Sequence, residues 1–242
     1  MTGSFPLTRS SLIADVRSPD GDRRQRAFEA LVTAYWKPVY KYVRIRWRSS
    51  PEDAQDLTQG FFTMALEKEF FAGYDANRAR FRTYLRTCLD GFVANERRAS
   101  RRLKRGGGAE LLPLDFLDAE GELRRHEVPA DAEMDEYFRR EWVRHVFGLA
   151  VTTLDRECAA SGKAAHFALF KRYDIEGRAA DEPLSYAALA AESGLPLTQV
   201  TNHLAWARQA FRRVVLATLR EATCSEEEFR AEARDVLGVD ER

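Results

Sequence analysis

The stretch Ser185–Arg213 reads SYAALAAESGLPLTQVTNHLAWARQAFRR. Its pattern predicts a short helix, a turn at Gly194 and a longer basic helix, because glycine adopts the positive φ of a tight turn at little steric cost. Ala190 is small at the point where the two helices must approach closely. Val200 and Leu204 are four residues apart and therefore share the buried face of the second helix. The stretch thus predicts a helix-turn-helix.

Polar residues occupy the N-terminal end of the second helix, which in this motif meets base edges in the major groove of DNA. The candidates for duplex contact on this helix are Thr198, Gln199, Thr201, Asn202, His203, Arg208 and Arg212. From Ser193 to Arg220 there are four arginines and no acidic residue, which favours contact with phosphates. Helical bundles that bind no DNA also contain such patterns, so this segment alone leaves DNA contact open.

Charge along the chain is balanced in total but sorted into blocks. The 242 residues include 38 basic and 38 acidic side chains. Residues 51–75 carry a net charge of −5, residues 78–105 of +8, and residues 109–136 of −8. A chain that separates its charges in this way is typical of a protein with more than one kind of partner.

Cysteine and histidine are too few and too scattered for a metal site. The three cysteines form no CxxC pair and the four histidines show no ligand spacing, so we expect a reducing cytoplasm, no metal and no cofactor. No apolar run approaches the roughly 20 residues of a membrane span, and we expect no membrane segment. No nucleophile, phosphate loop or carboxylate pair stands in a catalytic setting, so we expect a binding protein rather than an enzyme.

The basic block Phe81–Arg105, FRTYLRTCLDGFVANERRASRRLKR, alternates aromatic residues with arginines on one predicted helix and its approach loop. Arginines neutralise phosphates, and aromatic faces stack unpaired bases at about 1–3 kcal/mol per base. This combination suits single-stranded DNA better than a closed duplex. Helical spacing instead favours a core position for Phe81, Leu85 and Phe92, so Tyr84 and the arginines are the better candidates for contact.

The acidic segment Pro51–Leu66, PEDAQDLTQGFFTMAL, predicts a helix capped by Ser49 or Ser50. Its acidic side cannot attract DNA and could form a protein-docking surface. From the apolar stripe alone, a helix with one face in the core and a solvated acidic side is the favoured interpretation.

We expect an all-α fold of two helical domains joined by an acidic flexible linker, with the helix-turn-helix in the second domain. The predicted divisions are residues 1–105, a linker at 106–130 that begins with three glycines, residues 131–222, and an acidic tail helix at 223–242. Pro38 predicts either the first turn of a separate helix or a kink. The tail contains seven acidic and three basic residues, and we hypothesise that it covers a basic or apolar surface.

Taken in order, the segments DAQDLTQGFF, FRTYLR with RRASRR, the acidic linker and the terminal LSYAALAAESGLPLTQVTNHLAWAR resemble a bacterial RNA polymerase sigma factor of the extracytoplasmic-function type. The resemblance covers roughly Phe28–Arg220. It departs from the family at Asp90 and Ala94, where the family often has Asn and Asp, and the stretch between Cys158 and Leu184 is longer than usual.

The resemblance implies core RNA polymerase, promoter DNA and, for some members, an anti-sigma factor as partners. The residues that it assigns to polymerase docking are Asp53, Asp56, Leu57, Gln59 and Phe62. The residues that it assigns to the melted −10 element are Asn77, Arg78, Arg80, Arg82, Tyr84, Arg86, Arg97, Arg98, Arg101 and Arg102. It assigns the polar end of the terminal helix to the −35 element as duplex.

Two other functions compete with the sigma factor. A transcriptional regulator would bind duplex DNA through the same helix-turn-helix and need no polymerase, although it leaves the aromatic-basic block unexplained. A helical adaptor would use its basic patches to bind acidic partner proteins.

Overall fold

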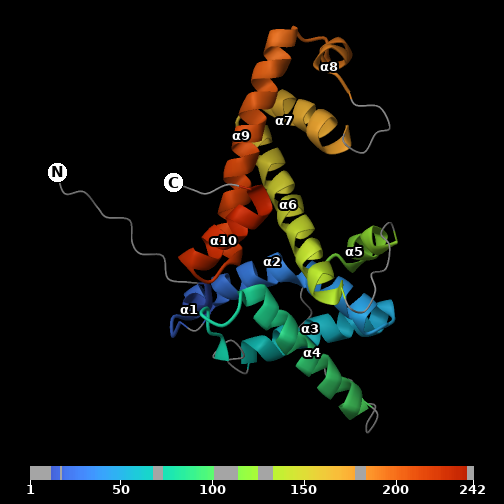
Figure 1. The fold of residues 1–242 in the computed structure, drawn as a ribbon, viewed down its shortest axis with the longest axis vertical. Helices are drawn as coiled ribbons and strands as arrows, with labels where there is room; N and C mark the ends of the chain where they lie inside the picture. Colours follow the sequence, from blue (N-terminus) through green and yellow to red (C-terminus); the bar gives the residue numbers. More distant parts are fainter. Residues whose placement is uncertain are drawn as a thin grey trace, which may run out of the picture. The chain divides into compact units, whose positions relative to one another are not determined.

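A computed structural model describes residues 12–16, 18–67, 73–100, 114–124, 133–177 and 184–238 of the chain. All regular elements in these ranges are helices, which confirms the all-α prediction (Figure 1). The chain divides into two compact units, Met1–His145 with Leu219–Arg242, and Val146–Thr218. Among the described helices, none combines the length and the apolar composition needed to cross a bilayer.

Within the described residues, the first unit contains the helices α1 to α5, the beginning of α6, the end of α9 and helix α10. Their bounds are α1 Leu12–Val16, α2 Gly21–Arg46, α3 Pro51–Glu67, α4 Phe81–Ser100, α5 Phe116–Leu123, α6 Met134–Ala160, α9 Leu197–Ala222 and α10 Glu226–Leu237. The division into units falls within α6 and within α9.

Helix α2 runs through Pro38 as a single helix, rather than ending there. Asp20 caps it by accepting hydrogen bonds from the backbone N–H groups of Asp22 and Arg23. A proline inside a helix costs about 3 kcal/mol, whereas each large apolar side chain that is fully buried contributes about 1.5–3 kcal/mol. Leu31 and Val39 are fully buried on either side of the proline, so burial along this face outweighs the lost hydrogen bond.

The core of the first unit is rich in aromatic side chains. The ring of Tyr35 stacks on Trp142 of α6 at 6.0 Å and meets the edge of Phe81 of α4 at 5.5 Å. Its hydroxyl donates to the carbonyl oxygen of Ala222 at 2.9 Å. Tyr42 meets Phe138 of α6 edge to face at 5.5 Å. Residues from both ends of the chain therefore build one core.

These contacts place residues 133–145 and 219–238 with the first unit, whereas the predicted divisions assigned them to the second domain and to a separate tail. Tyr137, Phe138 and Trp142 of α6 are buried there, as is Phe229 of α10. Large aromatic side chains gain most from burial, so they draw their segments into this core.

Part of the predicted flexible linker forms helix α5, which docks on α2. Asp115 caps α5, and the ring of Phe116 packs against Trp36 at 5.6 Å and Tyr40 at 5.0 Å. Lys37 of α2 pairs with two acidic residues of α5 at 2.6 and 2.8 Å. Asp118, Glu120 and Glu122 of α5 thus pair with side chains of α2; the glycines at 106–108 lie outside the described residues.

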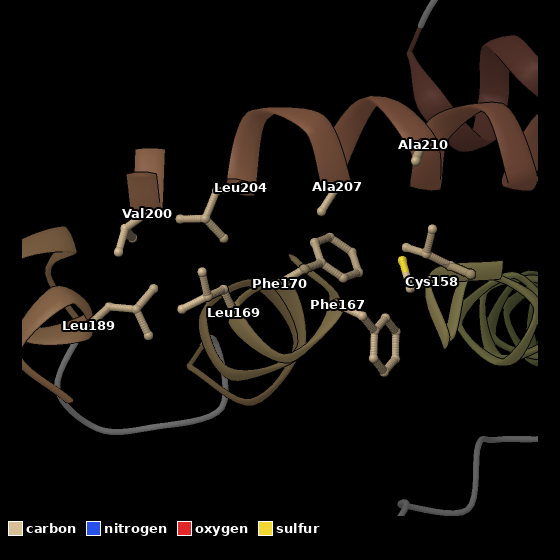
Figure 2. Close-up of a cluster of buried hydrophobic side chains, with 10 residues drawn as sticks. Cys158, Phe167, Leu169, Phe170, Leu189, Val200, Leu204, Ala207 and Ala210 are labelled. Atoms are coloured by element: carbon tan, nitrogen blue, oxygen red, sulfur yellow. The ribbon is translucent and has the colours of Figure 1, made fainter. Parts of the chain in front are cut away.

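The second unit consists of the end of α6, the short helices α7 (Ala164–Phe170) and α8 (Tyr186–Ser193), the π-helical turn η3 (Lys171–Glu176) and most of α9. Figure 2 shows that apolar side chains from α6, α7, α8 and α9 meet in one cluster. Leu189, Val200 and Leu204 are at most 1 % exposed in this cluster, as the spacing of Val200 and Leu204 predicts.

Candidate nucleic-acid interface

The turn between α8 and α9 has the geometry that the sequence predicts. Ser185 caps α8 by accepting from the N–H of Ala188 at 3.1 Å, and Gly194 ends the helix with φ of 67°. The N–H of Leu195 then bonds to the carbonyl oxygen of Ala190 at 3.2 Å. A side chain at position 194 would be strained by this backbone angle, so glycine fixes the direction in which α9 leaves the turn.

The first two turns of α9 present polar side chains to solvent. Thr198, Gln199, Thr201 and Asn202 are exposed, whereas Val200 between them points into the core cluster of the second unit. The Thr201 hydroxyl donates to the carbonyl oxygen of Leu197 at 2.9 Å. The amides of Gln199 and Asn202 carry both donors and acceptors, and are the groups on this face best suited to reading a base edge.

His203 lies at the border of this face and is half-buried. Its ring stacks on that of His166 from α7, with the ring centroids 3.8 Å apart. The Nδ1 atoms of both rings are buried without a hydrogen-bond partner. Burial, and then the neighbouring His203 and Lys163, lower the pKa of His166. His203 is therefore largely a packing residue in this structure.

Arg208 was predicted to contact DNA, but its side chain is held within the second unit. Its guanidinium makes a two-pronged ion pair with Asp174 at 2.9 and 3.0 Å and donates to the Tyr186 oxygen at 2.7 Å. It also lies over the rings of Tyr173 and Tyr186. These contacts make Arg208 a link between η3, α8 and α9, while Arg212 further along α9 is exposed.

The loop before α4 leaves two of the predicted DNA-contact residues, Asn77 and Arg78, open to solvent. Asn77 donates from its backbone N–H and its side chain to the Asp75 carboxylate at 3.0 and 3.1 Å. The side chain of Arg78 is 88 % exposed and lies 3.6 Å from the same carboxylate. An ion pair this exposed contributes at most about 1 kcal/mol, so Arg78 can exchange it for a phosphate.

Arg80 and Arg82 are covered by α10, in line with the hypothesis that the acidic tail covers a basic surface, although the sequence did not indicate which arginines it would cover. Arg80 pairs with Asp235 and lies 3.4 Å from Glu232; Arg82 pairs with Glu232 and is only 9 % exposed. The Arg82 guanidinium also lies 5.7 Å from the centre of the Trp142 ring. Neither arginine presents a free cation to DNA in this arrangement.

Tyr84 is half-buried rather than projecting into solvent. Its ring packs against Tyr74 at 5.4 Å, and its hydroxyl lies so close to Gly73 that a Cβ there would come within 3.1 Å. Burial, with the neighbouring Cys88 thiol, raises the pKa of Tyr84 to about 12. Tyr84 therefore stays uncharged at neutral pH and would not repel a phosphate.

Arg86 belongs to a network with Asp90. It pairs with Asp90 at 2.8 Å and with Asp135 of α6 at 2.9 Å. Asp90 also accepts from the Tyr42 hydroxyl and from Nε1 of Trp47, each at 3.1 Å. This network gives Asp90 an internal role in the first unit.

At the end of α4, the side chain of Arg97 contacts other residues of the chain, whereas that of Arg98 is exposed to solvent. Arg97 donates to the Ser49 hydroxyl at 3.0 Å and lies 5.2 Å over the Trp47 ring. Arg98 is exposed on the same helix. The remaining candidates, Arg101 and Arg102, lie outside the described residues.

The residues of α3 that are predicted to dock on the polymerase differ in how deeply they are buried. Ser50 caps this helix by accepting from the N–H of Asp53 at 3.0 Å. Asp53 and Asp56 are exposed, and two further candidates, Leu57 and Gln59, are half-buried.

Phe62 is fully buried, and its ring meets Phe61 at 5.4 Å. It therefore belongs to the core of the first unit rather than to an exposed docking face.

The comparisons with known proteins give no family: no protein-family model, curated protein or solved structure matches this chain.

Proposed function

We propose that this chain is a sigma factor of the extracytoplasmic-function type. It binds core RNA polymerase in the cytoplasm and directs promoter recognition, DNA melting and transcription initiation. The chemistry belongs to the polymerase, and the chain itself needs no cofactor.

The observation that carries the proposal is the tight turn at Gly194 between α8 and α9, together with the burial of one side of α9. The buried Val200 and Leu204 fix one side of α9, so the exposed Gln199 and Asn202 face away from the core. A major groove about 12 Å wide admits such a helix, and its N-terminal side chains then reach the base edges. In the proposed sigma factor this face reads the −35 element as duplex.

The first unit offers separate surfaces for the other two contacts. Asn77, Arg78 and Arg98 are exposed and could bind the phosphates of the melted −10 strand. On α3, Asp53 and Asp56 form an acidic exposed side that suits a basic surface on the polymerase. The separation of acidic and basic surfaces within one unit supports a protein that docks on an enzyme and grips DNA nearby.

A transcriptional regulator remains the second candidate, because one observation favours it. Arg80, Arg82, Arg86 and Arg97 are all engaged within the chain, which leaves fewer cations for single-stranded DNA than the sequence predicts. Such a regulator would use α9 alone to bind duplex DNA.

Gel filtration with core RNA polymerase distinguishes the two candidates. The purified chain should elute with the polymerase, and Asp56→Asn should weaken this association. The matched control is Asp155→Asn, which removes one exposed carboxylate from α6 in the second unit. Tight, sequence-specific binding to duplex DNA without any polymerase association would favour the regulator instead.

A further inference from the structure

Helix α10 places buried carboxylates against the rest of the first unit. Glu228 is 7 % exposed and Glu232 is 2 % exposed, beside the buried Phe229 and Ala233. Carboxylates are almost never buried to this degree unless they are paired. Their partners therefore show what kind of surface α10 covers.

That surface is built to hold anions. Glu228 accepts from the N–H of Phe81, the first residue of α4, at 2.5 Å, and from the N–H of Cys224 at 2.9 Å. Glu232 pairs with Arg82 and lies 3.4 Å from Arg80. A helix N-terminus with two arginines beside it binds carboxylates and phosphates by the same charge-assisted hydrogen bonds.

A third carboxylate of α10 also contacts this surface. Asp235 pairs with Arg80 at the outer edge of the helix. Only 39 % of the Asp235 side chain and 34 % of the Arg80 side chain remain exposed. A phosphodiester strand approaching α4 would find Arg80 and Arg82 already paired with carboxylates, whose negative charge would oppose its binding.

The burial of Glu232 weakens the binding of α10 to this surface. Burial raises the pKa of Glu232 despite the nearby Arg82 and Arg80, which means that removing this carboxylate from water opposes the attraction. A ligand that supplies several phosphates at once could therefore compete with it.

We propose that α10 is an autoinhibitory helix that fills, within the same chain, a binding site for the phosphates of single-stranded DNA. The inference rests on the proposed function, since Arg80 and Arg82 are two of the residues assigned to the melted −10 strand. In the free chain α10 masks them. Release of α10 in the polymerase complex exposes both arginines and the N-terminus of α4.

Removing the negative charges of α10 that pair with Arg80 and Arg82 tests the proposed autoinhibition directly in the full-length chain. The test variant is Glu232→Gln with Asp235→Asn. The control is Glu226→Gln with Glu227→Gln, which changes the charge of the same helix equally at two exposed positions. The probe is a fluorescein-labelled mixed-sequence 20-nucleotide single strand, followed by anisotropy without polymerase.

The test variant should bind the strand about tenfold more tightly than the wild type, and the control should match the wild type. Two newly available arginines should also steepen the salt dependence by about 1.4, at about 0.7 per phosphate contact. Equal affinities for the test and control variants, or no binding by any of them, would overturn the inference. Circular dichroism establishes that each variant is folded.

A second measurement needs no variant. Backbone amides of Glu226–Leu237 should exchange with deuterium faster when the wild type is saturated with the strand than when it is free. Unchanged protection in the bound state would reject the displacement of α10. Elution of each protein with core polymerase is measured in parallel. Unmasking without polymerase association would contradict only the proposed function, whereas association without unmasking would contradict only this inference.

Discussion

Lowering the pH should destabilise the first unit through His145. This residue of α6 is 8 % exposed, and its Nε2 lies 2.7 Å from the carbonyl oxygen of Thr33. Burial lowers the pKa of His145 to about 4 from the usual 6.5, and the charges of Lys37 and Lys41 act in the same direction. Between these two values the folded chain holds a neutral imidazole while the unfolded chain holds a protonated one.

The direction of this pH dependence follows from the number of protons that the folded and the unfolded states bind. The unfolded state takes up the extra proton, so the free energy of unfolding falls as pH drops from about 6.5 towards 4. The pKa of His145 is about 2.5 lower in the folded chain than in the unfolded chain, which corresponds to about 3 kcal/mol of the free energy of unfolding. About 2 kcal/mol of this stability is lost by pH 5.

The assay is urea unfolding of the wild type and His145→Gln at pH 7.5, 6 and 5, followed by tryptophan fluorescence. Three of the four tryptophans, Trp36, Trp47 and Trp142, lie in the first unit, so the signal reports mainly on it. The wild type should lose about 2 kcal/mol relative to the variant between pH 7.5 and 5.

Glu122 does not interfere above pH 5. Burial raises its pKa, but hydrogen bonds from Lys37 and Lys41 outweigh this and lower it to about 2. The stability that this carboxylate contributes is present above about pH 4.5 and is lost as the pH falls towards 2. Parallel pH profiles for the wild type and His145→Gln would refute the assignment of a neutral buried ring.

Three further predictions separate folding from recognition. Phe62→Ala should lower the free energy of unfolding by about 3–5 kcal/mol because it opens a cavity, whereas Asp56→Asn should change it by less than about 0.5 kcal/mol; denaturant unfolding checks both. Arg208→Ala should cost about 1 kcal/mol after solvent screening is allowed for, and should lower the melting temperature before any DNA is added. Gln199→Ala and Asn202→Ala should leave the melting temperature unchanged but weaken binding to the preferred duplex by about 1–3 kcal/mol per lost base contact, measured by competition with altered sequences.

Local features of the fold were predictable because neighbouring residues determine them. Ser50 caps α3, Gly194 takes the positive φ of its turn, and Val200 and Leu204 face the core, all as the spacing of polar and apolar residues predicts. Each of these depends on interactions within one or two helical turns. Burial of Phe81 and Leu85 was likewise favoured by helical spacing.

The contacts that the sequence did not reveal join residues far apart in the chain. Arg82 and Glu232 are separated by 150 residues, and Arg208 and Asp174 by 34, so no periodic pattern reveals either pair. From the sequence alone, an arginine side chain is expected to be exposed to solvent. Folding can nevertheless bring an acidic residue from a distant part of the chain close enough to pair with it. Phe62 was assigned to docking by resemblance, but the neighbouring ring of Phe61 shows that the apolar stripe of α3 extends across it.

Promoter opening in a reconstituted system tests the central claim most directly. Core RNA polymerase and the purified chain would be incubated with genomic DNA of the source organism, and the 5′ ends of the transcripts would be mapped by sequencing. Permanganate reactivity of unpaired thymines would then be measured at the mapped sites. The proposed function predicts new start sites whose upstream thymines become reactive only when both chain and polymerase are present. Start sites and reactivity identical with and without the chain would contradict it.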